Sequence, residues 1–386
     1  MHLADLPTPS LILDRRKLAA NLATMDERVQ RHPGVGFRPH LKTAKSADVA
    51  RLAVAGHAGG ITVSTVAEAE YFADHGFRDL LYAVAIVPAK LPRIAALMRR
   101  TGVAILLLVD SVEAARAVAE AGEALSTGFA ALIEIDTGEH RAGVAPDSPA
   151  LVEIGRALHR PPFASLRGVM THAGHSYGCR SVEAIADVAE AERAGTVRAA
   201  ERLRSAGLPA PVVSVGSTPT ALHARRLDGV TEIRAGVYMF GDMFQSAIGS
   251  CAVDDLAVSV LASVTGHNRE TGHLLIDAGG LALSKDRSTA DAPPPHDVGY
   301  GLVVREDGTR FPGGDLVVAR AYQEHGVVRP AGAAGSPPIP FGELPIGERV
   351  RVLPNHVCMT AAMYDRYHVV DGGTCIVAEW TRTNGW

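Results

Sequence analysis

The sequence of 386 residues predicts an α/β protein in which a (β/α)8 barrel is followed by a β-rich C-terminal domain. Three observations carry this prediction. Eight short β-rich runs recur up to about residue 240, Ala-, Arg- and Glu-rich stretches with helical spacing lie between them, and the helical pattern fades after about residue 250. Strands that alternate with helices are typical of a parallel sheet. Eight such units in roughly 210 residues fit a closed barrel.

The predicted strands of the barrel are apolar runs of strand length. In chain order they cover residues 35–41, 60–65, 80–87, 103–110, 129–136, 166–173, 211–217 and 230–240. Stretches such as "SADVARLAVAG" and "VEAIADVAEAERAGTVRAAERLRSAG" supply the helices between them. A doubly wound open sheet is the alternative, but no GxGxxG motif follows the first strand.

The C-terminal third of the chain has a different sequence pattern, with strand-like segments in place of alternating strands and helices. The segments "LAVSVLASVTGH", "HLLIDAGG", "DLVVARAYQEHG", "ERVRVLPNHVC" and "YHVVDGGTCIVAEW" are typical of antiparallel strands joined by turns. We therefore predict two domains: a barrel over residues 10–245, and a β-rich domain over residues 246–386 together with residues 1–9.

The composition excludes several classes of protein. The net charge of −4 provides no basic field for nucleic acid or for an anionic membrane. No run of eighteen apolar residues is present, and the start "MHLADLPTPSLILD" does not resemble a signal peptide. The four cysteines are scattered, which favours a reducing compartment. These features predict a soluble, cytoplasmic protein.

Polar residues follow five of the predicted strands. They are Lys42, Arg141, His172, Ser217 with Thr218, and Gly236. In an α/β barrel the carboxyl ends of the strands meet at one mouth, where the chemistry takes place. Each residue alone could be a loop cap or a satisfied polar group, but together they predict a site.

The lysine in "FRPHLKTAKS" lies among other basic side chains. Like charges and partial desolvation favour its neutral amine, which can attack a carbonyl and form a Schiff base. The segments "VGSTPTAL" and "IRAGVY" offer hydroxyls and glycine where a phosphate approaches the backbone. Pyridoxal 5′-phosphate (PLP) is therefore the cofactor that these residues suggest.

Eight motifs occur in an order that resembles a known family: "PSLILD", "RPHLKTAK", "EIDTGEHRAGV", "HAGHSY", "GSTPT", "RAGVYMF", "QEHG" and "PNHVC". The chain resembles the fold type III PLP enzymes, the alanine racemase-like group. It is most similar to the branch that contains D-serine dehydratase, D-threo-3-hydroxyaspartate dehydratase and D-threonine aldolase. The resemblance covers nearly the whole chain and both predicted domains.

The resemblance implies a role for each matching residue. Lys42 matches the Schiff-base lysine, whereas Lys45 does not; Arg141 matches an arginine near the phenolic oxygen, and His172 matches a histidine stacked on the pyridine ring. Arg234 matches a racemase arginine that faces the pyridine nitrogen. The remaining cofactor-binding residues implied are Tyr177, Ser217, Thr218, Gly236, Val237 and Tyr238.

His356 and Cys358, in "LPNHVCMT", are candidate metal ligands. Two residues apart on a strand, their side chains would share one face, and imidazole and thiolate suit zinc, with manganese, cobalt or magnesium as alternatives. A buried histidine and an inert cysteine are the other interpretation. The resemblance implies that dehydratases of this branch carry His-x-Cys here, whereas aldolases tend to carry His-x-Asp.

We therefore predict a PLP- and metal-dependent dehydratase of β-hydroxy-D-amino acids that releases a 2-oxo acid and ammonia. Lys42 would remove the α-proton, and the metal would help the β-hydroxyl leave. A retro-aldol enzyme that releases glycine and an aldehyde is the main alternative, followed by a racemase and a non-catalytic PLP-carrier protein. The resemblance also implies a homodimer whose sites take residues from both subunits, possible contributors being Glu324 and His325. The sequence does not choose among D-serine, D-threonine and the D-3-hydroxyaspartates.

Overall fold

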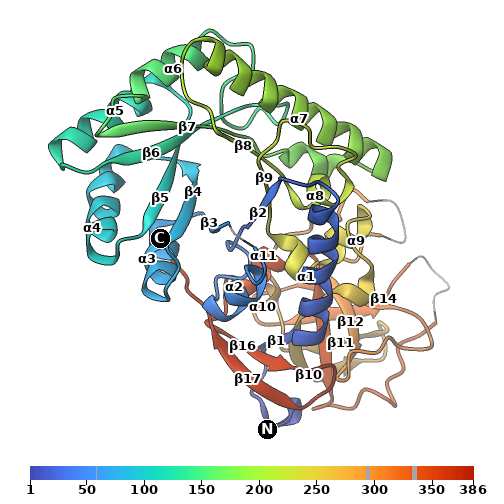
Figure 1. The fold of residues 1–386 in the computed structure, drawn as a ribbon. Helices are drawn as coiled ribbons and strands as arrows, with labels where there is room; N and C mark the ends of the chain where they lie inside the picture. Colours follow the sequence, from blue (N-terminus) through green and yellow to red (C-terminus); the bar gives the residue numbers. More distant parts are fainter. Residues whose placement is uncertain (58, 293–295, 333–336) are drawn as a thin grey trace. The chain divides into compact units, whose positions relative to one another are not determined.

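The computed structural model divides into two compact units, which we describe separately (Figure 1). The described residues are 1–57, 59–292, 296–332 and 337–386. The barrel unit contains Thr24–Gly236 and Thr383–Trp386, and the sheet unit contains Met1–Ala23 and Val237–Arg382.

Within the described residues, the barrel unit contains one sheet of eight parallel strands, as predicted. They are β2 (Gly36–Pro39), β3 (Ile61–Val63), β4 (Asp79–Ala85), β5 (Ala104–Val109), β6 (Phe129–Glu134), β7 (Ala164–Met170), β8 (Val212–Val215) and β9 (Glu232–Ala235). The order in the sheet is β2-β9-β8-β7-β6-β5-β4-β3. A bridge between His40 and Thr62 joins the two outer strands β2 and β3, so the sheet closes on itself.

Helices follow most of these strands, and α4 to α7 lie along the outside of the curved sheet (Figure 1). The helices up to the end of the barrel are α1 (Arg15–Gln30), α2 (Ala47–Ala53), α3 (Val66–Asp74), α4 (Leu91–Thr101), α5 (Val112–Ala124), α6 (Ala150–Leu158), α7 (Val182–Ser205) and α8 (Thr218–His223). Thr65, Ser111 and Ser181 begin three of them, because each hydroxyl accepts a backbone N–H of the first turn. Among the described residues, none of the helices has the length and apolar character needed to cross a membrane.

The strands of the barrel are buried on both faces, which explains their continuous apolar runs. Leu81, Leu108, Leu132 and Met170, from the neighbouring strands β4 to β7, form one fully packed cluster. Close packing on both faces prevents such a strand from shifting, so the backbone position of the residue at its end is also fixed.

The sheet unit has, in its described part, one sheet of nine strands. They are β1 (Ser10–Asp14), β10 (Val258–Asn268), β11 (His273–Ile276), β12 (Gly301–Arg305), β13 (Leu316–Ala321), β14 (Gly326–Pro330), β15 (Arg349–Pro354), β16 (Arg366–Val370) and β17 (Ile376–Thr381). The order is β11-β14-β13-β12-β15-β10-β1-β16-β17, and β11 also pairs with β10, so the six strands from β10 to β15 close into a ring. Its short helices are α9 (Met243–Ala247), α10 (Gly280–Leu283) and α11 (Val357–Ala361).

Strand β1 differs from the predicted domain division, which assigns residues 10–245 to the barrel. It pairs antiparallel with β10 and parallel with β16, so its contacts are those of the sheet unit. All five of its residues are buried. Because a continuous apolar run fits either kind of sheet, the pattern alone could not assign it to one of them.

We predict that Gly168→Ala destabilises the barrel markedly. Gly168 in β7 has a φ of +133°, and a Cβ there would lie 1.9 Å from the carbonyl oxygen of Val212 on β8. The matched control is Gly207→Ala, where φ is also positive but a Cβ would meet open space; its cost should be about 1–2 kcal/mol. Urea unfolding of both variants tests this, and an equal loss in the two would contradict it.

Candidate active site

Lys42 follows β2 and is exposed, whereas the nearby Lys45 is partly buried and contacts other parts of the barrel unit. The ammonium of Lys45 lies 3.1 Å from a carboxylate oxygen of the buried Glu68. The backbone of Lys45 has a φ of +48°, and its carbonyl accepts the N–H of Thr383 at 2.8 Å. These contacts engage Lys45 in the turn that follows Lys42, and the assignment of Lys42 as the reactive lysine stays a prediction.

His172 follows β7 and is neutral. Its Nδ1 lies 3.0 Å from the carbonyl oxygen of Gly216, and because a carbonyl only accepts, Nδ1 carries the proton. Burial first, and then the charge of Lys42, lower the pKa of His172 from 6.5 to about 3. An uncharged imidazole with a defined tautomer suits the predicted stacking on a pyridine ring.

Ser217 and Thr218 follow β8 and are both buried. The Oγ of Ser217 lies 2.9 Å from the Oγ of Ser176, in the segment η3 (Gly174–Gly178) after β7. Ser217 also begins α8, where its Oγ accepts the N–H of Thr220. The contact between the hydroxyls of Ser176 and Ser217 therefore connects the loops that follow the neighbouring strands β7 and β8.

Gly236 follows β9, and its lack of a side chain is required. A Cβ at this position would lie 2.8 Å from the carbonyl oxygen of His40. Val237 and Tyr238 come next in the chain, at the start of η4 (Val237–Met239), and both are buried. A position that admits only glycine leaves the backbone accessible, as expected for a segment that a phosphate approaches closely.

Arg141 and Tyr177 lie on longer loops of the barrel unit. Arg141 is exposed and pairs with Glu139 at 3.3 Å. The ring of Tyr177 lies 6.3 Å, centroid to centroid, from that of His172. Arg141 and Lys42 both lower the pKa of His172 electrostatically, so the barrel unit brings these predicted residues into one neighbourhood.

Arg234 on β9 is buried, and its guanidinium is engaged within the barrel. It donates to the hydroxyl of Ser214 at 2.9 Å and to the carbonyl of Thr171. It also lowers the pKa of His40, although burial and Lys42 contribute more to that shift. Its charge therefore acts on the same group of residues as Lys42.

His356 and Cys358 do not lie on a strand, so that part of the prediction is wrong. Strand β15 ends at Pro354; His356 is the residue before α11, and Cys358 is in its first turn. The helix begins here because Asp242, a buried residue distant in sequence, accepts the N–H of Val357 at 3.0 Å. The two side chains nevertheless hydrogen-bond to each other.

Asp286 is a site residue that the sequence analysis missed. Its carboxylate lies 2.6 Å from Nδ1 of His356, a contact that orients the imidazole and leaves Nε2 for another partner. Burial, the largest single effect, lowers the pKa of His356, but Cys358, Asp242 and Asp286 together raise it to about 10. Imidazole, thiol and an orienting carboxylate form a donor set that suits a divalent metal such as zinc.

The described residues contain no cluster of three or more His, Cys, Asp and Glu side chains arranged to hold a metal. His356 and Cys358 stay the predicted ligands, and a metal held by these two would have further coordination positions for water or substrate.

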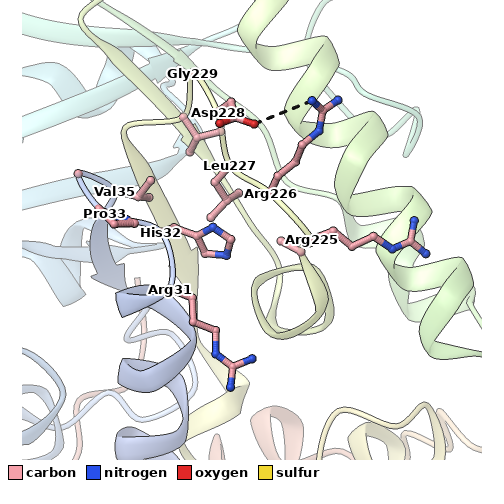
Figure 2. Close-up of a pocket in the computed structure, with 12 residues that line it drawn as sticks. Arg31, His32, Pro33, Val35, Arg225, Arg226, Leu227, Asp228 and Gly229 are labelled. Carbon is pink, nitrogen blue, oxygen red and sulfur yellow. Dashed lines mark ion pairs between the residues drawn. The ribbon is translucent and has the colours of Figure 1, made fainter.

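A pocket of about 780 Å³ lies elsewhere on the barrel unit (Figure 2). It is formed by residues 31–35 and 224–230, which precede β2 and β9, whereas Lys42 and Gly236 follow the opposite ends of these strands. Figure 2 shows the guanidinium groups of Arg31, Arg225 and Arg226 pointing in different directions. The pocket is separate from the candidate active site.

Two family models match the chain. The model for the alanine racemase N-terminal domain matches residues 13–243, and the model for a serine dehydratase domain matches residues 257–370. The chain is thus an alanine racemase-like protein of fold type III, a class for which PLP is implied. Within that class, it belongs to the family that joins the racemase-like domain to the serine dehydratase domain.

Individual relatives extend over the whole chain. It is 48% identical over 387 residues to D-threo-3-hydroxyaspartate dehydratase of Delftia sp. (strain HT23), covering 100% of this chain and 99% of that enzyme. Identity to D-serine dehydratase of Dictyostelium discoideum is 29% over 399 residues, covering 99% and 98% of the two chains.

Solved structures agree with these sequence matches. The structure of the Delftia enzyme matches with a TM-score of 0.94 and 47% identity over 100% of both chains. D-threonine aldolase from Filomicrobium marinum matches with a TM-score of 0.79 and 27% identity, over 98% of this chain and 96% of the other. The dehydratase is thus more similar to this chain than the aldolase, in sequence and in structure.

We expect His172 to stay neutral from pH 5 to 9, because its pKa is lowered to about 3. A histidine with a depressed pKa contributes stability that is present above pH 6.5 and is lost as the pH falls from 6.5 towards 3. Nitrogen-15 NMR of labelled histidine, with His172→Gln to assign the signal, measures this directly. A midpoint between pH 6 and 7 would contradict the lowering of this pKa by burial and by Lys42.

Proposed function

We propose that this chain is a PLP- and divalent-metal-dependent lyase that dehydrates β-hydroxy-D-amino acids to a 2-oxo acid and ammonia. The observation that carries the proposal is the pair His356 and Cys358, oriented by Asp286, in a chain whose dehydratase relatives match over its full length. A cysteine-to-alanine mutant of a D-threo-3-hydroxyaspartate dehydratase is known in a metal-free form, and a histidine two positions before that cysteine has also been mutated. The spacing is that of His356 and Cys358.

The residues that would hold PLP lie mainly in the barrel unit. Lys42 would carry the cofactor, and His172 would lie against its ring as a neutral imidazole. Arg141 would approach the phenolic oxygen, and Tyr177 would support His172. The phosphate would be bound by Ser217, Thr218, Gly236, Val237 and Tyr238.

Each group in the proposed site has a distinct chemical role. PLP supplies an electron sink for the charge left at the α-carbon, and the metal supplies a Lewis acid for the β-hydroxyl. The amine of Lys42 would accept the α-proton of the substrate. His356 and Cys358 supply one nitrogen and one sulfur ligand, a set for which zinc is the preferred ion.

The preferred substrate in this proposal carries a second carboxylate. Lys285 and Arg287 flank Asp286, and their cationic groups each lie 5.8 Å from the centre of the Tyr300 ring. Arg287 already binds both carboxylate oxygens of Asp297, at 3.0 and 2.8 Å. Lys285 also donates to the carbonyl of Ala321. These two cations next to Asp286, which contacts His356, are our basis for preferring 3-hydroxyaspartate, in which the β-carbon carries both hydroxyl and carboxylate, over D-serine.

A homodimer is part of the proposal. The turn between β13 and β14 exposes Tyr322, Glu324 and His325, and its backbone bonds to the start of α10. An exposed turn anchored to the segment just before Asp286 suits a surface that a second subunit covers. Light scattering of the purified protein measures the oligomeric state.

Product analysis tests the proposed reaction. The protein with PLP and zinc is given D-threo-3-hydroxyaspartate, D-serine and D-threonine separately, with and without EDTA. We expect ammonia and a 2-oxo acid, with the highest rate on the hydroxyaspartate and loss of activity on chelation. Lys42→Ala should lower the rate by about 10³-fold, the size of a general-base contribution. Glycine and an aldehyde as products would replace the dehydratase by an aldolase.

We predict that Asp286→Asn weakens zinc binding by about 10–100-fold, because it removes the carboxylate that orients His356. Competition with a chromophoric chelator measures the affinity without reference to catalysis. Asp254→Asn is a matched control, since Asp254 is an exposed carboxylate of the same unit. Equal zinc affinity of the two variants would argue against the assigned role of Asp286.

A further inference from the structure

Glu192 is a buried carboxylate that neither the motifs nor the proposed chemistry accounts for. It lies in the middle of α7 and is 1% exposed. Ile185, Ala189, Thr196 and Ala199 are buried on the same helix, at the spacing of one helical face. A charged group in such a stripe is costly unless it meets specific partners.

The partners of Glu192 are two backbone N–H groups from different loops. Its Oε1 accepts the N–H of Gly216 at 2.8 Å and the N–H of Ala173 at 3.1 Å. Thr220 also hydrogen-bonds to the carboxylate. One oxygen atom thus joins the loop after β7 to the loop after β8.

Both loops carry residues assigned above to the cofactor. Ala173 follows His172, and Gly216 precedes Ser217. His172 donates from Nδ1 to the carbonyl of Gly216, and Glu192 accepts the N–H of the same glycine. Both polar groups of the Gly216 backbone are therefore bound. The ring-stacking histidine and the phosphate-binding serine are therefore linked through Glu192.

The loop after β8 is packed so closely that the N–H of Gly216 has no room to turn to another acceptor if Glu192 is lost. Gly216 has a φ of +132°, and a Cβ there would lie 2.2 Å from the carbonyl oxygen of Arg234, so the backbone is packed directly against β9. Burial raises the pKa of Glu192 to about 7, which means that the folded protein bears the cost of this carboxyl group when it ionises. A well-packed apolar residue would avoid that cost, but it would leave both N–H groups without an acceptor.

We propose that Glu192 is a positioning residue for the cofactor: by accepting the N–H groups of Ala173 and Gly216, it sets the distance between His172 and Ser217. The inference deepens the proposed function and depends on it, because those two residues must contact PLP. It assigns Glu192 no contact with substrate.

The test compares four variants in PLP affinity, measured by absorbance titration of the cofactor-free protein. Glu192→Ala removes the acceptor, Glu192→Asp keeps the charge but shortens the reach, and Glu192→Gln keeps the reach and one acceptor oxygen. Glu190→Gln is the control: Glu190 lies on the same helix and pairs with Arg193 and Arg226.

We expect the PLP dissociation constant to rise about tenfold or more for Ala and Asp, because two buried N–H groups lose their acceptor. It should stay within about threefold of wild type for Gln and for the Glu190 control. The nitrogen-15 signal of His172 should also move in the Ala variant and return in the Gln variant. A general loss of packing would affect stability without this pattern of rescue.

Two results would overturn the inference. One is unchanged PLP affinity in Glu192→Ala despite lowered stability; the other is an Asp variant that binds as wild type while the Gln variant does not, which would make charge rather than reach decisive. Failure of the proposed function has a different signature. In that case the wild-type protein itself binds no PLP, or borohydride fails to fix PLP to Lys42.

Discussion

The closure of the parallel sheet is the constraint on which the candidate active site depends. The first and last barrel strands, β2 and β9, pair over four residues, and a bridge between His40 and Thr62 joins β2 to β3 and completes the ring. The pairing of β2 with β9 places the residues that follow these two strands, such as Lys42 and Gly236, at neighbouring positions. Gly236 lies against His40 because of this pairing. Lys42 and the candidate phosphate-binding segment are thus brought together by backbone pairing and not by an interaction between their side chains.

Burial then sets the charge of each group in the site. His40 and His172 lose their protons because they are buried near other cations, and Glu192, buried with little compensating charge, holds its proton more tightly than a normal carboxyl. His356 shows the opposite behaviour, because Cys358 and two carboxylates outweigh the effect of burial. Histidine is therefore neutral in the barrel unit, at His40 and His172, and charged beside acidic partners in the sheet unit, at His356.

The sequence predicted those features that depend on local patterns. All eight barrel strands were predicted, since each is a short apolar run, and Lys42 was singled out because it follows such a run. Residues 10–14 were placed in the barrel domain, whereas strand β1 pairs in the other sheet, because its partners are distant in sequence. The local structure of His356 and Cys358 was missed for the same reason: Asp242, which starts α11, lies more than a hundred residues away. Glu192 could have been found, because it interrupts an apolar helical stripe.

Strand β1 also has a consequence for synthesis on the ribosome. Its five buried residues are made before the whole barrel, yet they pair with residues 258–261 and 368–370. During translation, this apolar segment must wait for partners that emerge hundreds of residues later, while the barrel strands between them can already pair with one another. An unpaired apolar strand is a site for aggregation. The nascent chain should therefore benefit from chaperones that shield its N-terminal segment until the second sheet is complete.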